Sequence, residues 1–365
     1  MKISLVLGSG GPRGWAHIGV IQELEARGHE IAAISGCSVG SLVGGVYAAG
    51  KLPEFTEWLL QLTKSDVRSL LDFTLTDPGV VKGERVLNEI KEIVGEPNIE
   101  DLSLPYTAVA VDILSGREVW FQHGPLFLAI RSSISIPTLF TPVMIGDRLL
   151  VDGGVLNAVP VEPTLAHTTD FTVAVNLNGP ALRTPHEVLQ QKQEEERTLF
   201  DLSAIGDTWE RTKKSIMSTD LFQQIEQRLF SEDDNDSADD AAEDMKDTAK
   251  TVEAKNAEEP ADKKEQAAGA DPELEQHKKA PVDTVEDTPI TAQPLPDGLT
   301  TLGVMNLSLD VMQDFIQRYR NAAIPVPCTV QIPKDAVGDL DYHRAAELIE
   351  LGSEKAAAKF DEMGI

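Results

Sequence analysis

The segment Gly36-Cys37-Ser38-Val39-Gly40 places a serine between two glycines in the G-x-S-x-G pattern. An apolar stretch over residues 31–34 precedes it, and small helix-compatible residues follow over 41–49. Strand, sharp turn and helix around this pattern make a nucleophile elbow, which exposes the serine hydroxyl for attack on a carbonyl. Gly36 and Gly40 provide the lack of bulk that such a turn needs. An ordinary strand-to-helix crossover with a serine N-cap would use the same residues, so the neighbouring motifs decide.

A glycine-rich loop over residues 8–14 lies between an apolar stretch at 3–7 and a helical pattern at 17–27. The bare N–H groups of such a loop bind a phosphate or an oxyanion equally well. A dinucleotide-binding fingerprint would need glycine in place of Arg13 and an acidic residue at the end of the next strand. That strand ends in Ser35 and the elbow, so the two turns favour acyl transfer over hydride transfer.

In the acyl-transfer interpretation, the backbone amides of Gly10 and Gly11 donate hydrogen bonds to the oxyanion of a tetrahedral intermediate. Arg13 follows them closely in the sequence. Its guanidinium either holds the loop, neutralises charge or is solvated, and the sequence leaves these three roles open.

A third loop, Asp152-Gly153-Gly154, follows a short apolar stretch at 149–151. An aspartate that leaves a strand and precedes two glycines has the position of a catalytic carboxylate at the carboxyl edge of a sheet. Asp-Gly also forms ordinary turns. Asp112 is the competing carboxylate, but no glycine follows it.

A histidine would complete a Ser-Asp-His triad, and His343 comes late enough in the chain for the order found in α/β-hydrolases. That fold places several strands before its elbow, whereas only one strand and one helix are expected before Ser38. His17, just after the glycine loop, is more typical of a local hydrogen-bonding partner. We therefore favour a serine–aspartate pair, with Cys37 as a small buried residue rather than a second nucleophile.

The formal net charge of −28 argues against nucleic acid as a partner. Cys37 and Cys328 are too few and too far apart for a disulfide framework or a zinc site, which fits a reducing cytoplasm. No signal peptide is recognisable, and no apolar run reaches the ~18 residues of a membrane span. These features predict a soluble cytoplasmic protein.

Buried strands are expected over residues 106–113 and 171–177, and a hairpin partner over 117–121. Helices are expected over 84–94 and 125–131. This alternation predicts an α/β fold, a mainly parallel sheet covered by helices on both faces. Residues 55–73 form amphipathic helices whose apolar stripe faces the core, lines an acyl-chain site or belongs to a lid.

Residues 231–300 contain 21 Asp and Glu against 7 Lys and almost no large apolar residues, so we expect disorder there. An amphipathic helix at 206–230 and another at 302–319 flank this acidic insertion and would pair as a hairpin. A strand at 328–332 and a helix at 342–360, interrupted at Gly352, follow. The predicted organisation is a first domain at 1–205, the helix, the insertion, and a segment at 301–365 that completes the first domain.

Together, the three loops resemble the patatin-like phospholipase family, specifically its bacterial cytoplasmic branch. That family carries a glycine-rich loop with a basic residue, then G-x-S-x-G, then D-G-G or D-G-A. Residues 133–142, Asn157 and Pro160 fit the same pattern, whereas Ser9 stands where members usually have a leading glycine. The resemblance covers residues 1 to about 180 strongly and the C-terminal strand and helix weakly.

The resemblance implies a three-layer α/β/α catalytic domain with a Ser–Asp dyad and with no cofactor or metal. Ser38 would attack an ester carbonyl, and Asp152 would orient Ser38 and accept its proton. A free aspartate with a pKa near ~3.9 is a poor base, so the site must desolvate it or act through water. The other expected site residues shape the three loops: Gly10, Gly11, Arg13, Gly36, Gly40, Gly153 and Gly154.

The leading interpretation is a cytoplasmic hydrolase of lipid esters, of the phospholipase A or lysophospholipase type. It would contact a membrane or micelle transiently, peripheral to the inner membrane face, although its negative charge opposes anionic membranes. One alternative is an acyltransferase with the same dyad. Another is a lipid-binding regulatory scaffold whose acidic insertion recruits an unidentified protein. The helices flanking the insertion offer apolar residues for a membrane, for each other or for a homo-oligomer interface.

Overall fold

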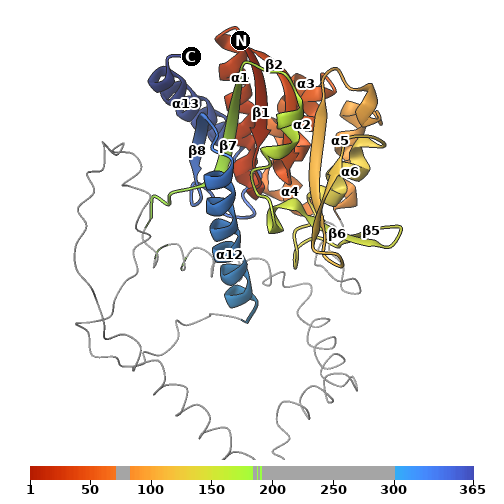
Figure 1. Cartoon of the computed structure of the whole chain (residues 1–365). Helices are drawn as coiled ribbons and strands as arrows, with labels where there is room; N and C mark the ends of the chain where they lie inside the picture. The colour runs from red at the N-terminus through yellow and green to blue at the C-terminus, as the bar shows by residue number, and fades with distance from the viewer. Residues whose placement is uncertain (71–82, 184–186, 188–189, 191–300) are drawn as a thin grey trace, which may run out of the picture. The chain divides into compact units, whose positions relative to one another are not determined.

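The structure, a computed structural model, describes residues 1–70, 83–183, 187, 190 and 301–365. An eight-stranded sheet in the order β5-β6-β3-β2-β1-β7-β8, with β4 also paired to β3, forms its centre (Figure 1). The predicted α/β fold with a mainly parallel sheet is confirmed. The strands are β1 (Lys2–Leu7), β2 (Glu30–Cys37), β3 (Tyr106–Asp112), β4 (Arg117–Phe121), β5 (Val143–Ile145), β6 (Arg148–Asp152), β7 (Phe171–Gly179) and β8 (Cys328–Pro333).

The strand β3 joins the parallel and antiparallel parts of the sheet. Its partner β4 pairs antiparallel along one edge, over β3 residues 108–112. The other two partners therefore share the second edge: β2 pairs with 106–109 in parallel, and β6 pairs with 110–112 in antiparallel. Consequently β2 and β6 approach the same point of β3 from opposite directions, and their last residues meet there.

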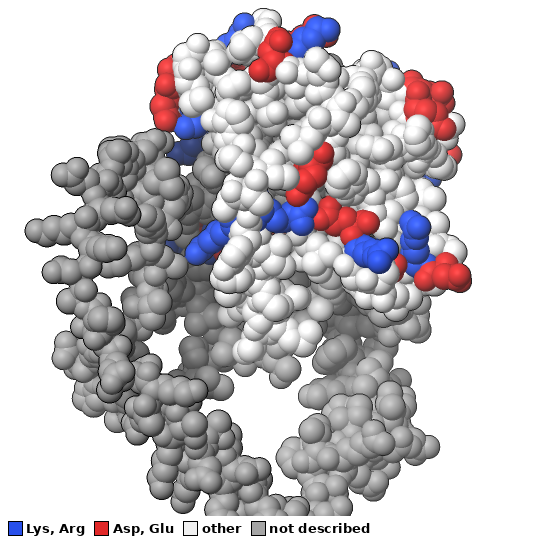
Figure 2. Space-filling view, in the orientation of Figure 1, with Lys and Arg blue, Asp and Glu red and all other residues white. Residues whose placement is uncertain are grey.

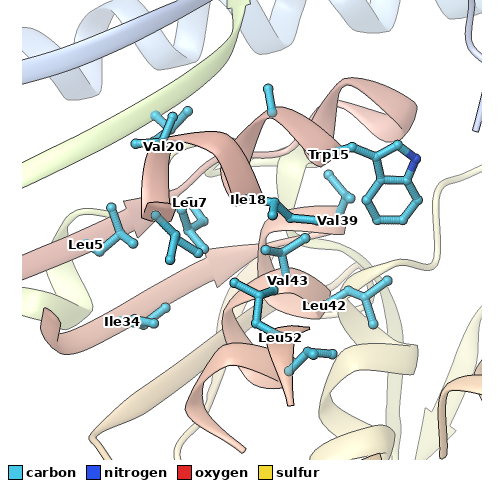
Figure 3. Packing of buried hydrophobic residues seen from close by; sticks show 14 of the residues in the cluster. Leu5, Leu7, Trp15, Ile18, Val20, Ile34, Val39, Leu42, Val43 and Leu52 are labelled. Atoms are coloured by element: carbon cyan, nitrogen blue, oxygen red, sulfur yellow. The ribbon is translucent and has the colours of Figure 1, made fainter. Parts of the chain in front are cut away.

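Most helices of the described part pack on one face of the sheet, whereas the 3-10 helix at Glu162–Ala166 and the helix at Thr301–Ala323 lie at the other. Leu5 and Leu7 of β1 and Ile34 of β2 belong to one buried cluster with Ile18 of α1 and Val43 of α2 (Figure 3). The helices are α1 (Ala16–Ala26), α2 (Val39–Ala48), α3 (Leu52–Gln61), α4 (Lys64–Leu70), α5 (Glu84–Val94), α6 (Leu126–Ser133), α12 (Thr301–Ala323) and α13 (Ala345–Met363). Short 3-10 helices are η1 (Gly11–Trp15), η2 (Ile99–Asp101), η3 (Gly153–Val155) and η4 (Glu162–Ala166).

A smaller apolar cluster covers the opposite face. Val6 of β1 and Ala174 of β7 pack with Val159 and Val161, which precede η4. These residues alternate along β1 and β7 with those of the larger cluster, as the side chains of a strand buried on both faces must.

The C-terminal helix α13 continues through Gly352, so the predicted interruption there is wrong. The reason is close packing against α1: a Cβ atom at Gly352 would lie 2.0 Å from the carbonyl oxygen of Ala16. A Cβ atom at Gly19 of α1 would similarly lie 2.0 Å from the carbonyl oxygen of Ile349. Gly352 therefore allows α13 to pack closely against α1. This packing offsets the free-energy cost of a glycine inside a helix.

The helix α12 is attached to the sheet by polar contacts near its C-terminal end. The amide of Val159 donates to Gln317 Oε1 at 3.0 Å, and Arg320 forms ion pairs with Glu118 and Glu162 at 2.7 and 2.6 Å. Large apolar side chains of α12 are exposed: Val304, Met305, Val311, Met312, Phe315 and Tyr319. Within the described ranges, no helix has the length and apolar character that crossing a bilayer requires.

Several sequence-based expectations lie outside the described residues. They are the end of the 55–73 amphipathic segment, the helix at 206–230, its pairing with the helix at 302–319, and the disorder of 231–300. The predicted domain boundaries at 205, 230 and 300 fall there as well and stay predictions.

Candidate active site

The turn around Ser38 has the shape expected of a nucleophile elbow. Strand β2 ends at Cys37, helix α2 begins at Val39, and Ser38 between them has φ 55° and ψ −128°. This left-handed conformation is strained for a residue with a side chain, and such strain is concentrated at functional sites. A Cβ atom at Gly40 would lie 2.1 Å from the carbonyl oxygen of Leu7, so only glycine allows the helix to approach β1.

Hydrogen bonds to the backbone of Ser38 hold this turn. Its amide donates to Ser133 Oγ at 2.8 Å, and Ser133 Oγ donates in turn to the carbonyl oxygen of Val109 at 2.6 Å. Its carbonyl oxygen accepts from Ser41 Oγ at 2.6 Å. Ser133 begins the family pattern at 133–142, but the sequence does not predict its contact with Ser38, since the two residues are 95 positions apart.

The carboxylate of Asp152 lies beside the end of β2. Asp152 pairs with Ala110 on β3, and Cys37 pairs with the preceding residue, Val109. Asp152 Oδ1 accepts from the amide of Gly154 at 2.7 Å and from Cys37 Sγ at 3.6 Å. Its other oxygen, Oδ2, is buried and forms no hydrogen bond of standard geometry with a described residue.

Burial raises the pKa of Asp152 to about 6, because the apolar surroundings disfavour its charge. The nearby Ser38 hydroxyl, the Gly154 amide and the Cys37 thiol oppose this shift, since each favours the ionised form. The Ser38 hydroxyl is thus close enough to influence the carboxylate, although the resting geometry is not that of a formed hydrogen bond. The pKa of Cys37 is raised well above its usual value by burial, so this residue remains a thiol.

The glycine-rich loop is fastened at both ends. The amides of Gly8 and Ser9 donate to the carbonyl oxygens of Val175 and Ala158 at 3.0 and 2.8 Å. Arg13 Nε donates to the carbonyl oxygen of Gly10 at 2.9 Å, and Arg13 Nη1 donates to that of Lys334. These contacts hold the loop, which is one of the three roles that the sequence left open for Arg13.

The amides of Gly10 and Gly11 have no hydrogen-bond acceptor among the described residues. Gly11 lines the same cavity as Ser38, whereas Gly10 is not among the residues that line it. His17 is buried, and its Nε2 lies 2.9 Å from the carbonyl oxygen of Gly8. Burial lowers the pKa of His17 to about 4, so it is a neutral support of the loop at physiological pH.

The competing carboxylate, Asp112, caps the β3–β4 hairpin. Its oxygens accept from Ser115 Oγ at 2.6 Å and from the amides of Leu114 and Leu149 at 3.2 Å. These hydrogen bonds, that from Ser115 above all, lower its pKa. Asp112 is therefore an ionised structural residue, and its bonds account for both carboxylate oxygens.

A cavity of about 90 Å³ lies beside Ser38 and is walled almost entirely by apolar side chains. Six of its sixteen described lining residues lie on α3, α4 and α5, so the amphipathic segment at 55–73 forms part of the wall. Trp15 and Tyr342 are among the lining residues outside 55–73, which the sequence did not predict. The lining residues are Gly11, Trp15, Ser38, Val39, Leu42, Trp58, Leu59, Leu62, Val67, Leu70, Val86, Ile90, Ile134, Ile136, Phe140 and Tyr342.

Ligands for a metal ion are not gathered at this site. Across residues 1–70, 83–183 and 301–365, no three His, Cys, Asp or Glu side chains come together in a way that would hold one.

Comparison with known proteins gives relatives along nearly the whole chain. The family model for patatin-like phospholipases matches residues 5–165. An uncharacterized NTE family protein of Mycobacterium tuberculosis is 36% identical over 362 residues, which cover 96% of this chain and 89% of that protein. A Debaryomyces hansenii lysophospholipase is 32% identical over 192 residues, covering 50% of this chain and 12% of that protein.

Among solved structures, VipD from Legionella pneumophila is similar with a TM-score of 0.30 and 13% identity, covering 57% of this chain and 55% of that one. The full-length relative, the family model and the three loops in their expected order agree. This chain belongs to the patatin-like phospholipase family.

Proposed function

We propose that this chain is a serine acyl hydrolase that cleaves carboxylic esters of lipids, of the phospholipase A or lysophospholipase type. One observation carries the proposal: a strained serine faces an apolar cavity beside a buried carboxylate whose pKa is raised to about 6. That shift makes Asp152 a better base than an ordinary aspartate near neutral pH. A serine–aspartate dyad requires a desolvated aspartate, and the burial that raises the pKa of Asp152 supplies that desolvation.

The proposed reaction begins with Ser38 Oγ attacking the ester carbonyl carbon, while its proton passes to Asp152 Oδ2. The carbonyl oxygen becomes an oxyanion, which the amides of Gly10 and Gly11 would stabilise. The carbon–oxygen bond to the alcohol then breaks, and the alcohol leaves with the proton from Asp152. Water then attacks the acyl-serine and gives one of its protons to Asp152. The bond between Ser38 Oγ and the acyl carbon breaks, the fatty acid leaves, and Asp152 returns that proton to Ser38 Oγ.

The apolar wall beside Ser38 supports an acyl chain as the bound part of the substrate. The cavity of about 90 Å³ holds only a short part of such a chain, being well below the ~300–1,000 Å³ of a typical ligand site. A long chain would therefore require the lining helices to move apart. On the face seen in Figure 2, Lys and Arg side chains lie among Asp and Glu side chains, so neither sign of charge dominates there.

The direct test incubates the purified chain with lysophosphatidylcholine or diacyl phosphatidylcholine in micelles and measures released fatty acid. We chose lysophosphatidylcholine first because the fungal relatives are named lysophospholipases. Ser38→Ala should abolish release, and Ser35→Ala, on the strand that precedes the turn, should retain it. An added alcohol that captures the acyl group in preference to water would indicate an acyltransferase. Release that persists in Ser38→Ala would contradict the proposal.

A further inference from the structure

Tyr342 lines the cavity of Ser38, and its hydroxyl lies close to Gly11 of the glycine loop. This hydroxyl is 3.8 Å from the position that a Cβ atom would take on Gly11. Both residues line the cavity with Ser38, and among the described lining residues only Tyr342 and Ser38 bear a hydroxyl. The hydrogen bond from Trp15 uses the carbonyl oxygen of Tyr342 and leaves its hydroxyl free to donate to a bound substrate oxygen.

The position of Tyr342 is fixed by the glycine loop itself. Trp15 Nε1 donates to the carbonyl oxygen of Tyr342 at 3.0 Å, and the two rings pack edge to face with centroids 5.9 Å apart. Arg13, two residues before Trp15, donates to the carbonyl oxygen of Lys334. The loop between β8 and α13 is therefore attached at both ends to η1, the segment that contains Gly11. A hydroxyl held this way is preorganised relative to the Gly11 amide.

The Tyr342 hydroxyl also keeps its proton. Burial, and then the nearby charges of Asp339 and Asp152, raise its pKa, because each disfavours a phenolate. The Tyr342 side chain is therefore a permanent hydrogen-bond donor.

We infer that Tyr342 is a catalytic hydrogen-bond donor that binds the oxyanion beside the amides of the glycine loop. The inference rests on the proposed function, since it assigns a role in the same acyl transfer. It places in the site a residue from the C-terminal segment, more than 300 positions away from the nucleophile. It also gives the attachment of that segment to η1 a chemical purpose in addition to stability.

The test compares Tyr342→Phe with the wild type in the hydrolysis of p-nitrophenyl butyrate, a substrate without a phosphate head group. The phenylalanine keeps the ring that packs on Trp15, and the bond to Trp15 uses a backbone carbonyl, so the variant should fold. Loss of one oxyanion donor should lower kcat about 100-fold and change KM little. Tyr47→Phe is the matched control, because its hydroxyl contacts Glu25 away from the cavity and its loss should leave kcat unchanged.

A second readout uses a trifluoromethyl ketone, which adds reversibly to the nucleophilic serine and forms an oxyanion. In Tyr342→Phe this oxyanion would lack the same hydrogen-bond donor. The inhibition constant should therefore rise by about the factor by which kcat/KM falls. A kcat that is unchanged in Tyr342→Phe would overturn the inference. So would a variant that only raises KM for lysophospholipid, which would make Tyr342 a head-group contact.

The failure of the proposed function is recognised separately. If the wild type hydrolyses no ester, or if Ser38→Ala is as active as the wild type, the proposed function is wrong and the assignment of Tyr342 falls with it. If hydrolysis depends on Ser38 but not on the Tyr342 hydroxyl, the function stands and only the assignment is wrong.

Discussion

The backbone amide of Ser38 donates a hydrogen bond to Ser133 Oγ, which itself donates one to the carbonyl oxygen of Val109. The last residue of α6 thereby connects the strained turn to β3. The bond also occupies the amide of Ser38, which is therefore not free to donate to an oxyanion. Ser133 thus fixes the backbone of Ser38, the proposed nucleophile, through contacts with main-chain groups alone.

Replacing this hydroxyl should loosen the elbow. In Ser133→Ala, the buried Ser38 amide and Val109 carbonyl lose their partner, so we expect a loss of about 1–3 kcal/mol in the free energy of unfolding. We also expect a lower kcat with little change in KM, since the nucleophile is misplaced rather than the acyl site. Urea unfolding and ester hydrolysis measure the two effects.

Ser132→Ala is the matched control for this change. Ser132 is equally buried, but its hydroxyl bonds to the carbonyl oxygen of Leu128 within the same helix. Its loss should leave kcat near the wild-type value. Equal kcat values in the two variants would show that Ser133 has no positioning role.

The activity should depend on the ionisation of Asp152. A base must be deprotonated, so kcat/KM for a neutral ester should fall as the pH decreases through about 6. Cys37→Ala removes a hydrogen bond that favours the carboxylate, so it should move this midpoint to higher pH. Cys328→Ala, the other buried free thiol, should not move it. A midpoint near 4 in the wild type would mean that burial does not perturb Asp152.

Removing the charge of Asp152 should stabilise the fold while it impairs catalysis. The unfolded carboxyl loses its proton near 3.8 and the folded one near 6, so folded Asp152 is penalised above that range by about 3 kcal/mol. Asp152→Asn escapes this penalty, so its melting temperature should exceed that of the wild type at pH 8. The difference should vanish below pH 4, where the wild-type carboxyl is protonated in both states.

Asp112→Asn gives the opposite expectation and serves as the control. Its hydrogen bonds lower the pKa of the folded carboxyl, so its charge contributes stability at neutral pH, and the asparagine should be less stable there. A lower melting temperature of Asp152→Asn at pH 8 would show that the buried carboxylate is stabilised by contacts other than those described here.

The wall of the cavity should control acyl-chain length. Leu62 lines the cavity at the end of α3, whereas Leu60 on the same helix is 52% exposed. Leu62→Trp should reduce hydrolysis of a p-nitrophenyl decanoate relative to an acetate by about 10-fold or more, because fewer methylenes can be buried. Leu60→Trp should leave this ratio unchanged. A chain-length preference that is insensitive to Leu62 would place the acyl chain elsewhere.

The local parts of the site were predictable, because each rests on a short-range pattern. The elbow around Ser38 and the turn after Asp152 follow from glycines next to strand ends, and most strands and helices lie near their expected positions. The short strand β5 was missed, since three residues next to proline carry no clear alternation. The contact between the two loops depends on β6 pairing antiparallel beyond the end of β2, which no local pattern encodes.

Contacts over long sequence distances were also out of reach. Ser133 reaches Ser38, and Tyr342 reaches Gly11, only because the sheet brings their elements together. Gly352 was expected to interrupt its helix, because the sequence does not reveal that α1 packs against it. At Gly352, packing against α1 outweighs the low helix propensity of glycine.

Labelling with a fluorophosphonate shows directly whether Ser38 is a nucleophile activated by Asp152. This probe forms a covalent bond with an activated serine, and circular dichroism verifies that each variant is folded. We expect labelling of the wild type, none in folded Ser38→Ala, and strongly slowed labelling in Asp152→Asn, with Ser35→Ala labelled normally. Labelling that survives in Ser38→Ala would mean that another residue is the nucleophile, and labelling of Asp152→Asn as fast as that of the wild type would mean that Asp152 does not activate Ser38.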